Sequence, residues 1–481
     1  MEKIKEFCIG LIVFTFFMTM ITSSGWAWGA GKIPNLDEWL KQKNILDDPR
    51  PFLKGAGDPK NFLTPELYKK VTFDVEAMKK AWADVIGFMS PDLVGKIAPE
   101  IKPGTYTFQD KDKYPFKELM SAFHYNRFKP GGPPHVGNFS EIKVVPTRQY
   151  YWALPIAEAT KKNEGKTKLD DKGYFVPESY VAGYPFPKPS GKFKAQQVVY
   201  NWYKRYNDGE NNVVNERAMG FNRKLMNDWE SYMNYWELKL NGRVLIEPFG
   251  WYDERARKRG EERAFNFVYN SPQDSAGNAY INMIFDDPDK SNQPLFYIAQ
   301  MRRIRKLSAE DTQDPYPGGD LTMDDGYGFQ QKLTYRRFPY KYELVGEREY
   351  LVPNYTWDGS MYFDSKKGYE LHNEWERRPV YVLQLTQLDP NYIYSKRILY
   401  IDKESFTLLF TENYDQKGRL YRTHENFHAF HPEQGMFHWW AMLGMDHVDL
   451  HSHIMNIFGN SWADWVTRDH TGVGVMMKKG K

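Results

Sequence analysis

The chain has 481 residues, of which 41% are hydrophobic, and a formal net charge of +3 at pH 7. This length and composition allow a sizeable buried core, and the near-neutral charge lacks the strong basic field that nucleic-acid binding requires. No nucleic-acid partner is therefore expected. Aromatic residues are abundant, at 16%. Such rings can line an apolar cavity, stack on sugars or fill a large β-sheet core.

The N-terminus has the pattern of a secretory signal peptide. Lys3 and Lys5 precede an apolar run over 7–21, and small residues around Ala27 follow it. The run is short for a bilayer span, so we expect residues 1–27 to be a signal peptide cleaved near Ala27. An uncleaved membrane anchor is the alternative.

Cysteine usage agrees with export to a periplasm. Cys8 is the only cysteine, and it lies at the start of the apolar run, where a lipid-anchoring cysteine would not lie. The mature chain then has no thiol for a disulfide, a metal thiolate or a nucleophile. Export without disulfides suits a bacterial periplasm better than a disulfide-stapled extracellular domain.

Helical signals come early in the chain. Thr64-Pro65-Glu66 is typical of a helix start, residues 71–89 carry apolar side chains at helical spacing, and residues 194–206 do the same. The run KPGGPP over 129–134 is typical of a loop or a boundary. We therefore expect residues 28–130 to form a partly helical extension and residues 131–481 to form the main domain.

Strand signals dominate after about residue 213. The clearest stretch is 392–429, in which three apolar-rich runs are separated by four-residue turn signals at 402–405 and 415–418. Connections this short predict an antiparallel meander. Further strands are expected at 244–246, 280–285, 342–350 and 380–386. The pattern predicts an α+β fold with a large curved antiparallel sheet and helices packed against it.

Several blocks of sequence resemble a known bacterial family. They include VVPTRQYYWALP (144–155), QMRRIRKLSAEDTQDPYPGGDLTMDD (300–325) and YSKRILYIDKESFTLLFTENYDQKGRLYR (394–422). Together with blocks at 183–209, 340–355 and 368–386, they occur in the same order over about two-thirds of the chain. The family is one still named as a domain of unknown function, whose members resemble the LolA and LolB lipoprotein carriers and are often called outer membrane lipoprotein-sorting proteins.

This resemblance implies a half-closed antiparallel β-barrel, LolA/LolB-like, with helices at its mouth. It implies a soluble periplasmic carrier or adaptor for a hydrophobic cargo, such as a lipid or the acyl chain of a lipoprotein. The implied partners are an inner-membrane exporter of the RND type and an outer-membrane barrel protein. Carriage through water requires an apolar cavity, because each exposed methylene costs about 0.8 kcal/mol.

Residues with period-two spacing on the expected strands are the candidates for lining such a cavity. For any single residue, packing in a solid core is the alternative that the sequence favours. Phe406, Leu408 and Phe410 are expected on one face of their strand. The full set is Met283, Phe285, Leu383, Leu385, Ile398, Tyr400, Phe406, Leu408 and Phe410.

A basic cluster followed by acidic residues is a candidate docking site. Its cations are Arg302, Arg303, Arg305 and Lys306. Adjacent guanidinium groups can bind a lipid phosphate or an acidic partner. The acids Asp311, Asp314, Asp320, Asp324 and Asp325 follow, and they could gate the cluster or coordinate a hard cation. The alternative is a solvated strand and loop in local charge balance.

Eight of the eleven histidines lie in the last 58 residues. If residues 446–453 form a strand, then His447, Asp449, His451 and His453 share one face and could bind zinc or iron. The alternative is a polar sheet face that binds no metal.

Motifs of ordinary enzymes are lacking. The sequence has no nucleophile elbow, no phosphate-loop lysine motif and no dinucleotide-binding glycine fingerprint between a strand and a helix. We therefore expect a non-catalytic carrier without a cofactor. Two other functions stay open: a metal-dependent periplasmic enzyme that uses the C-terminal histidines, and a module that binds envelope polysaccharide.

Overall fold

The computed structural model describes residues 63–131, 137–224, 227–308, 312–315, 320–356, 362–364, 370–460 and 463–474. The expected signal peptide at 1–27 lies outside these residues. Within them, no helix is both long and apolar enough to cross a membrane.

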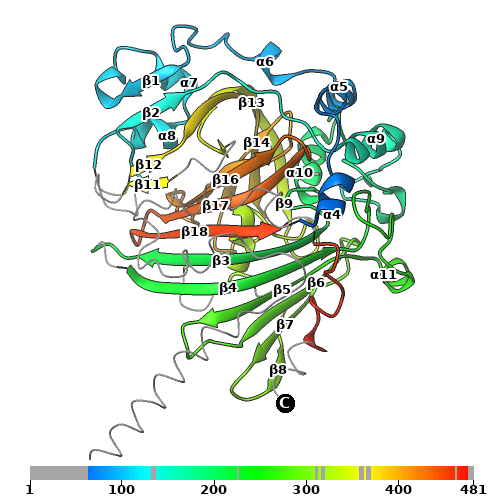
Figure 1. The fold of residues 1–481 in the computed structure, drawn as a ribbon. Coiled ribbons are helices and arrows are strands. Elements are labelled where there is room, and N and C mark those ends of the chain that lie inside the picture. Colours follow the sequence, from blue (N-terminus) through cyan, green and yellow to red (C-terminus); the bar gives the residue numbers. More distant parts are fainter. Residues whose placement is uncertain are drawn as a thin grey trace, which may run out of the picture.

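A large curved sheet forms the body of the molecule (Figure 1). In the described part of the chain it has 16 strands. Two antiparallel meanders make up most of it, and they join where β18 pairs with β3, from Ser452 opposite Phe221 to Asn460 opposite Val213. The first meander is β3 (Asn211–Phe221), β4 (Asn227–Lys239), β5 (Glu261–Ser271), β6 (Ala279–Phe285), β7 (Gln293–Ile298) and β8 (Arg303–Lys306).

The second meander confirms the strands expected around residues 380–429. Its members are β13 (Glu374–Gln387), β14 (Lys396–Asp402), β15 (Leu408–Tyr414), β16 (Leu420–His431), β17 (Met436–Asp446) and β18 (His451–Asn460). β9 (Tyr340–Val352) pairs with the outer edge of β13. The turn signals at 402–405 and 415–418 connect β14 to β15 and β15 to β16, as predicted.

The expected fold class, α+β with a large curved sheet and packed helices, is confirmed, and the sheet is unclosed. It is mixed rather than purely antiparallel, because β13 also runs parallel to β2 (Glu141–Val144), and β10 (Tyr355–Thr356) runs parallel to β16. β1 (Gly104–Thr107) extends the sheet beyond β2. β11 (Tyr362–Asp364) and β12 (Glu370–His372) form a separate pair.

Helices gather around the sheet and share its core (Figure 1). The Thr64 hydroxyl caps the first of them by accepting a hydrogen bond from the Leu67 amide, as its sequence predicts. Trp82 donates its indole N–H to the Glu404 carbonyl, 2.8 Å away, so the early helices pack directly on the sheet. The helices are α4 (Pro65–Lys70), α5 (Val75–Ile86), α6 (Ser90–Leu93), α7 (Phe116–Leu119), α8 (Ala122–Arg127), α9 (Leu154–Asn163), α10 (Lys194–Tyr203) and α11 (Glu254–Arg259).

The strand expected at 244–246 does not form. These residues belong to an irregular loop whose three amide groups donate hydrogen bonds to the buried carboxylate of Glu210, over 2.5 to 3.1 Å. The Glu210 carboxylate thus accepts the backbone hydrogen bonds that a neighbouring strand would otherwise accept. An apolar run of three residues is too short to distinguish these outcomes.

A bulge in β15 changes which side chains share a face. Ile401 pairs with Leu408, but Tyr400 pairs with Phe410, so Leu409 is an extra residue. Phe410 then faces outward and contacts His124 of α8, with ring centroids 4.6 Å apart. Phe406 precedes the strand and has a φ of 57°. The expectation that Phe406, Leu408 and Phe410 share a strand face is therefore wrong.

Leu408 is fully buried in the main core. We expect Leu408→Ala to lower the free energy of unfolding by about 2–5 kcal/mol, because the substitution leaves a cavity that the sheet cannot fill. Chemical denaturation measures the change, and Leu388→Ala at an exposed position is the control. A loss as small as that of the control would contradict the core position.

Candidate functional site

Residues 320–333, here called the plug segment, lie against the inner face of the curved sheet. The segment begins with a capping box, in which the Thr322 amide and hydroxyl both donate to the Asp325 carboxylate. A short 3-10 helix, η5 (Met323–Gly328), follows. The backbone turns sharply at its end, because Tyr327 and Gly328 both have positive φ, 52° and 79°. A Cβ at Gly328 would lie 3.3 Å from the Leu408 side chain.

Buried arginines of the second meander hold the plug segment. The Asp325 carboxylate accepts hydrogen bonds from the Tyr394 hydroxyl at 2.9 Å, Arg397 at 3.4 Å and Arg422 at 3.5 Å. Asp324 accepts from Tyr392 at 2.5 Å. These two acids are thus buried and paired with residues distant in sequence. The alternative that the acids lie in a solvated loop is therefore wrong for Asp324 and Asp325.

The two neighbouring acids differ in their pKa. Burial raises the pKa of Asp324 to about 6. Burial acts on Asp325 in the same direction, but His424, Arg397 and Arg422 outweigh it and lower its pKa to about 2. Asp325 is the acid that pairs directly with Arg397 and Arg422, and its low pKa keeps it charged well below neutral pH.

We expect Asp325→Asn to lower the free energy of unfolding by about 3–5 kcal/mol at pH 7, because Arg397 and Arg422 lose a buried partner. The pKa of Asp325 is lower in the folded state than the unfolded value of about 3.9. The difference from wild type should therefore shrink as the pH falls from about 4 towards 2. Denaturant unfolding at pH 7 and pH 3 measures it, with Asp314→Asn on an exposed side chain as control. Equal effects of the two changes at pH 7 would contradict this account.

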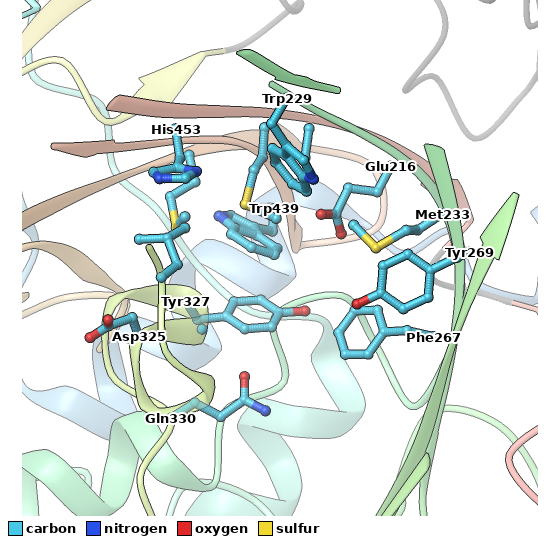
Figure 2. Close-up of a pocket in the computed structure, with 15 residues that line it drawn as sticks. Glu216, Trp229, Met233, Phe267, Tyr269, Asp325, Tyr327, Gln330, Trp439 and His453 are labelled. Atoms are coloured by element: carbon cyan, nitrogen blue, oxygen red, sulfur yellow. The ribbon is translucent and has the colours of Figure 1, made fainter. Parts of the chain in front are cut away.

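A pocket lies between the plug segment and the inner face of β3, β4, β5, β17 and β18 (Figure 2). It encloses about 690 Å³, including the space at its open mouth. A smaller pocket of about 250 Å³ adjoins it and shares four residues with it. The lining is mainly aromatic rings and methionines. It comprises Glu216, Ala218, Trp229, Met233, Phe267, Tyr269, Leu321, Asp325, Gly326, Tyr327, Gln330, Trp439, Met442, His453 and Met455.

Tyr327 connects the plug segment to this part of the sheet. Its ring stacks on Trp439 with centroids 4.0 Å apart, and its hydroxyl donates to Asp208 at 3.1 Å. Asp208 also accepts from the Trp439 amide at 2.6 Å, and it pairs with His438 at 3.2 Å. The stacked rings therefore form a fixed wall between the two pockets.

Glu216 is the unusual residue of the pocket. Its side chain points inward from β3, among Trp229, Trp439 and Met233 (Figure 2). The residue is only 2% exposed. Among the described residues it forms no ion pair, and its buried Oε1 accepts no hydrogen bond. Burial raises the pKa of this carboxyl to about 8.

The structure places the nine predicted cavity residues outside this pocket. Leu383, Leu385 and Leu408 face the inner side but are packed in the core. Ile398, Tyr400 and Phe410 face outward, where Tyr400 and Phe410 stack with centroids 3.9 Å apart. Met283 packs with the cluster of Trp236, Leu238 and Val466 on the other side of the sheet. Phe285 and Phe406 are buried elsewhere, beneath Lys290 and beside Trp82.

The predicted basic cluster lies at an edge of the sheet. β8 pairs only with β7 in the described part of the chain, and Arg302, Arg303, Arg305 and Lys306 are all exposed. Ile304 and Met301, also exposed, lie among them. The acids of the plug segment have other partners: Asp325 pairs with Arg397 and Arg422, and Asp324 accepts hydrogen bonds from Tyr392 and Gln331.

The predicted histidine face does not form as a single strand. His447 and Asp449 lie in the turn between β17 and β18, and His447 pairs with the Thr423 hydroxyl at 3.0 Å. His451 and His453 do share a face of β18, where both approach the Asp320 carboxylate, at 2.7 and 3.2 Å. No group of three or more potential ligands in the described ranges is arranged to hold a metal ion. Metal binding by these residues stays a hypothesis.

Sequence reasoning missed the residues that line the pocket, apart from His453 and Asp325. A signal was available in β3, where Val214, Glu216 and Ala218 alternate on one face and place a single acid among small apolar residues. Trp229 and Met233 repeat the spacing on β4. The turn signals at 392–429 are clearer, so the sequence pattern indicated that stretch rather than β3 and β4.

Comparison with known proteins places the chain in a family. The family described as protein of unknown function (DUF1329) matches residues 114–467. The chain belongs to this family. An uncharacterized protein of Pseudomonas aeruginosa is 23% identical over 354 residues, which cover 69% of this chain and 70% of that protein.

The solved structures that match this chain have low sequence identity to it. A proposed outer membrane lipoprotein-sorting protein domain from Vibrio parahaemolyticus has a TM-score of 0.42 at 14% identity, over 58% of this chain and 97% of that one. A DUF1329 protein from Desulfovibrio piger has a TM-score of 0.40 at 14%, over 59% and 95%. A LolA superfamily protein from Nitrosomonas europaea has a TM-score of 0.33 at 15%, over 55% and 90%. Likeness at this level does not transfer a ligand or an activity.

Proposed function

We propose that this protein is a periplasmic carrier that holds a hydrophobic cargo in the pocket beneath the plug segment. The observation that carries this proposal is the position of the pocket, which lies between the plug segment and an apolar part of the inner face of the sheet. Five strands and the plug segment contribute to it, so an apolar chain could be enclosed on several sides. Burying such a chain gains about 0.8 kcal/mol per methylene.

The lining suits a cargo of variable shape. Met233, Met442 and Met455 are flexible and polarizable, and methionines adapt to irregular apolar ligands. Trp229 lies at a half-buried position in the lining, where an entering ligand would meet it. We infer a binding protein rather than a catalyst, because carriage needs only apolar surface and a way in.

The basic strand β8 is proposed as the docking element. It offers three cations on a sheet edge, with Arg302 just before them, and Ile304 and Met301 are exposed beside these cations. Guanidinium groups bind carboxylates and phosphates in a bidentate manner. By family resemblance, the proposed partners are an RND-type exporter of the inner membrane and a barrel protein of the outer membrane.

We expect Ala218→Phe to weaken binding of a fluorescent lipid at least tenfold, because the new ring would fill the pocket next to Met233 and Tyr269. Overpacking costs about 1–3 kcal/mol, so the protein should stay folded. Fluorescence titration together with thermal melting measures both properties. Val345→Phe at an exposed position of β9 is the matched control.

Lipid extraction and mass spectrometry of protein purified from the periplasm test the same proposal directly. Wild type and the Val345→Phe control should carry a co-purified lipid or lipoprotein acyl chain, and Ala218→Phe should carry much less. Full binding by a folded Ala218→Phe protein would place the cargo elsewhere. Elemental analysis of the same sample tests the metal hypothesis.

We expect the triple change of Arg302, Arg303 and Arg305 to glutamine to reduce cross-linking to the exporter in cells, with little change in melting temperature. All three side chains are exposed, so they contribute little to stability. The wild-type interaction should weaken as salt is raised, because salt screens exposed charges. Unchanged cross-linking and cargo uptake in the triple variant would contradict the docking role of β8 and indicate a solvated strand.

A further inference from the structure

Glu216 occupies a position that is costly for an acid. The residue is 2% exposed, and its Oε1 is buried without a hydrogen-bond donor. A buried polar group without a partner is unfavourable by about 1–3 kcal/mol, and an ionised one by more. The core of a carrier for plain hydrocarbon would be more stable with an apolar residue here. We therefore infer that the ligand interacts with the Glu216 carboxyl.

Its surroundings favour a positive charge. The rings of Trp229, Trp439, Phe267 and Tyr269 line the same space, and the faces of aromatic rings attract cations. The other carboxylate of the lining, Asp325, is already paired with Arg397 and Arg422. Glu216 is thus the one carboxylate among the lining residues that has no cation beside it.

We propose that the pocket binds a cationic amphiphile, a molecule with an apolar chain and a quaternary or tertiary ammonium head, whose positive charge lies between Glu216 and the surrounding aromatic rings. This deepens the proposed carrier function and rests on it. The apolar chain would lie along the methionines of β4, β17 and β18.

The hydrogen-bonding capacity of the pocket favours an alkylated ammonium over a primary one. A primary ammonium needs three acceptors. The buried lining atoms without a partner are Glu216 Oε1, an acceptor, and Trp439 Nε1, a donor. A quaternary head needs no hydrogen bond, so charge and aromatic contact suffice. Such contacts contribute about 0.5–2 kcal/mol per ring.

Proton release should accompany binding. The free Glu216 carboxyl is mostly protonated at pH 7, because burial raises its pKa to about 8. A bound cation favours the ionised form, so affinity should rise with pH up to about 8. The titratable groups that line the two pockets with Glu216 are Asp208, Tyr235, Tyr269, Asp325, Tyr327 and His453. A protonated His453 would repel the same cation, and Glu216→Gln separates the two contributions because it leaves His453 in place.

The experiment compares three ligands with the same ten-carbon chain and different head charge. Decyltrimethylammonium, 1-decanol and decanoate compete with a neutral fluorescent probe for the full-length mature protein at pH 6, 7 and 8.5. The two ionic ligands are kept below their micelle concentrations, and 1-decanol is kept below its solubility limit. The variants are Glu216→Gln and, as control, Glu141→Gln at an exposed position of β2. Thermal melting of each variant at pH 5 and pH 8 accompanies the titrations.

In wild type and Glu141→Gln, decyltrimethylammonium should bind at least tenfold more tightly than the other two ligands at pH 8.5, with a smaller preference at pH 6. Glu216→Gln should lose this preference and keep its affinity for 1-decanol. It should also melt at a higher temperature than wild type at pH 8 but not at pH 5. The folded pKa of Glu216 lies above its unfolded value, so its cost to stability grows as pH rises from about 4 to 8.

The outcomes separate the two proposals. Equal binding of the cation and the alcohol, or a preference for the cation that survives in Glu216→Gln, overturns the cationic ligand and leaves the carrier proposal standing. Tighter binding of decanoate also overturns it, since Glu216 would then act as a neutral donor to a fatty acid. Failure of all three ligands to displace the probe, or of the probe to bind, contradicts the carrier proposal itself.

Discussion

The pairing of Asp324 and Asp325 with buried residues of the second meander determines the shape of the interior. Four polar side chains follow one another in register across that half of the sheet: Arg397, Asn413, Arg422 and Asp446. Buried cations require partners, because a charge removed from water without one is strongly unfavourable. Asp325 of the plug segment is the acidic partner of Arg397 and Arg422. These ion pairs hold the plug segment against β14 to β16. The pocket is the space that remains between the plug segment and the inner face of β3 to β5.

The two halves of the sheet consequently have different characters. The plug segment covers the inner face of β14 to β16 and pairs with its arginines, whereas the inner face of β3 to β5 is rich in aromatic and methionine side chains and lines a pocket. Tyr327 marks the border, because its ring belongs to the pocket while the acids just before it belong to the charged network. One short segment thus performs both tasks, and strain in its backbone at Tyr327 is compatible with that dual role.

The sequence predicted the architecture better than the site. The turn signals at 402–405 and 415–418 and the cap at Thr64 act over a few residues, so they can be read without knowing the rest of the fold. The pocket depends on pairing between β18 and β3, which no local pattern reports. The bulge at Leu409 moved Phe410 to the outer face, and the inner positions of β6 are Tyr280 and Ile284 rather than Met283. A shift of one residue exchanges the faces of a strand.

The seam between β18 and β3 has a consequence for how the chain folds. Each meander can form from contacts between neighbours in sequence, but the seam joins residues more than 200 positions apart, such as Ser452 and Phe221. Non-local pairings of this kind slow folding, since a large loop must close before they stabilise anything. Until the last strand arrives, β3 and β17 each present an open edge on which another chain could pair. A chaperone that shields those two edges would therefore act at the slow, aggregation-prone step of folding that precedes the pairing of β18 with β3.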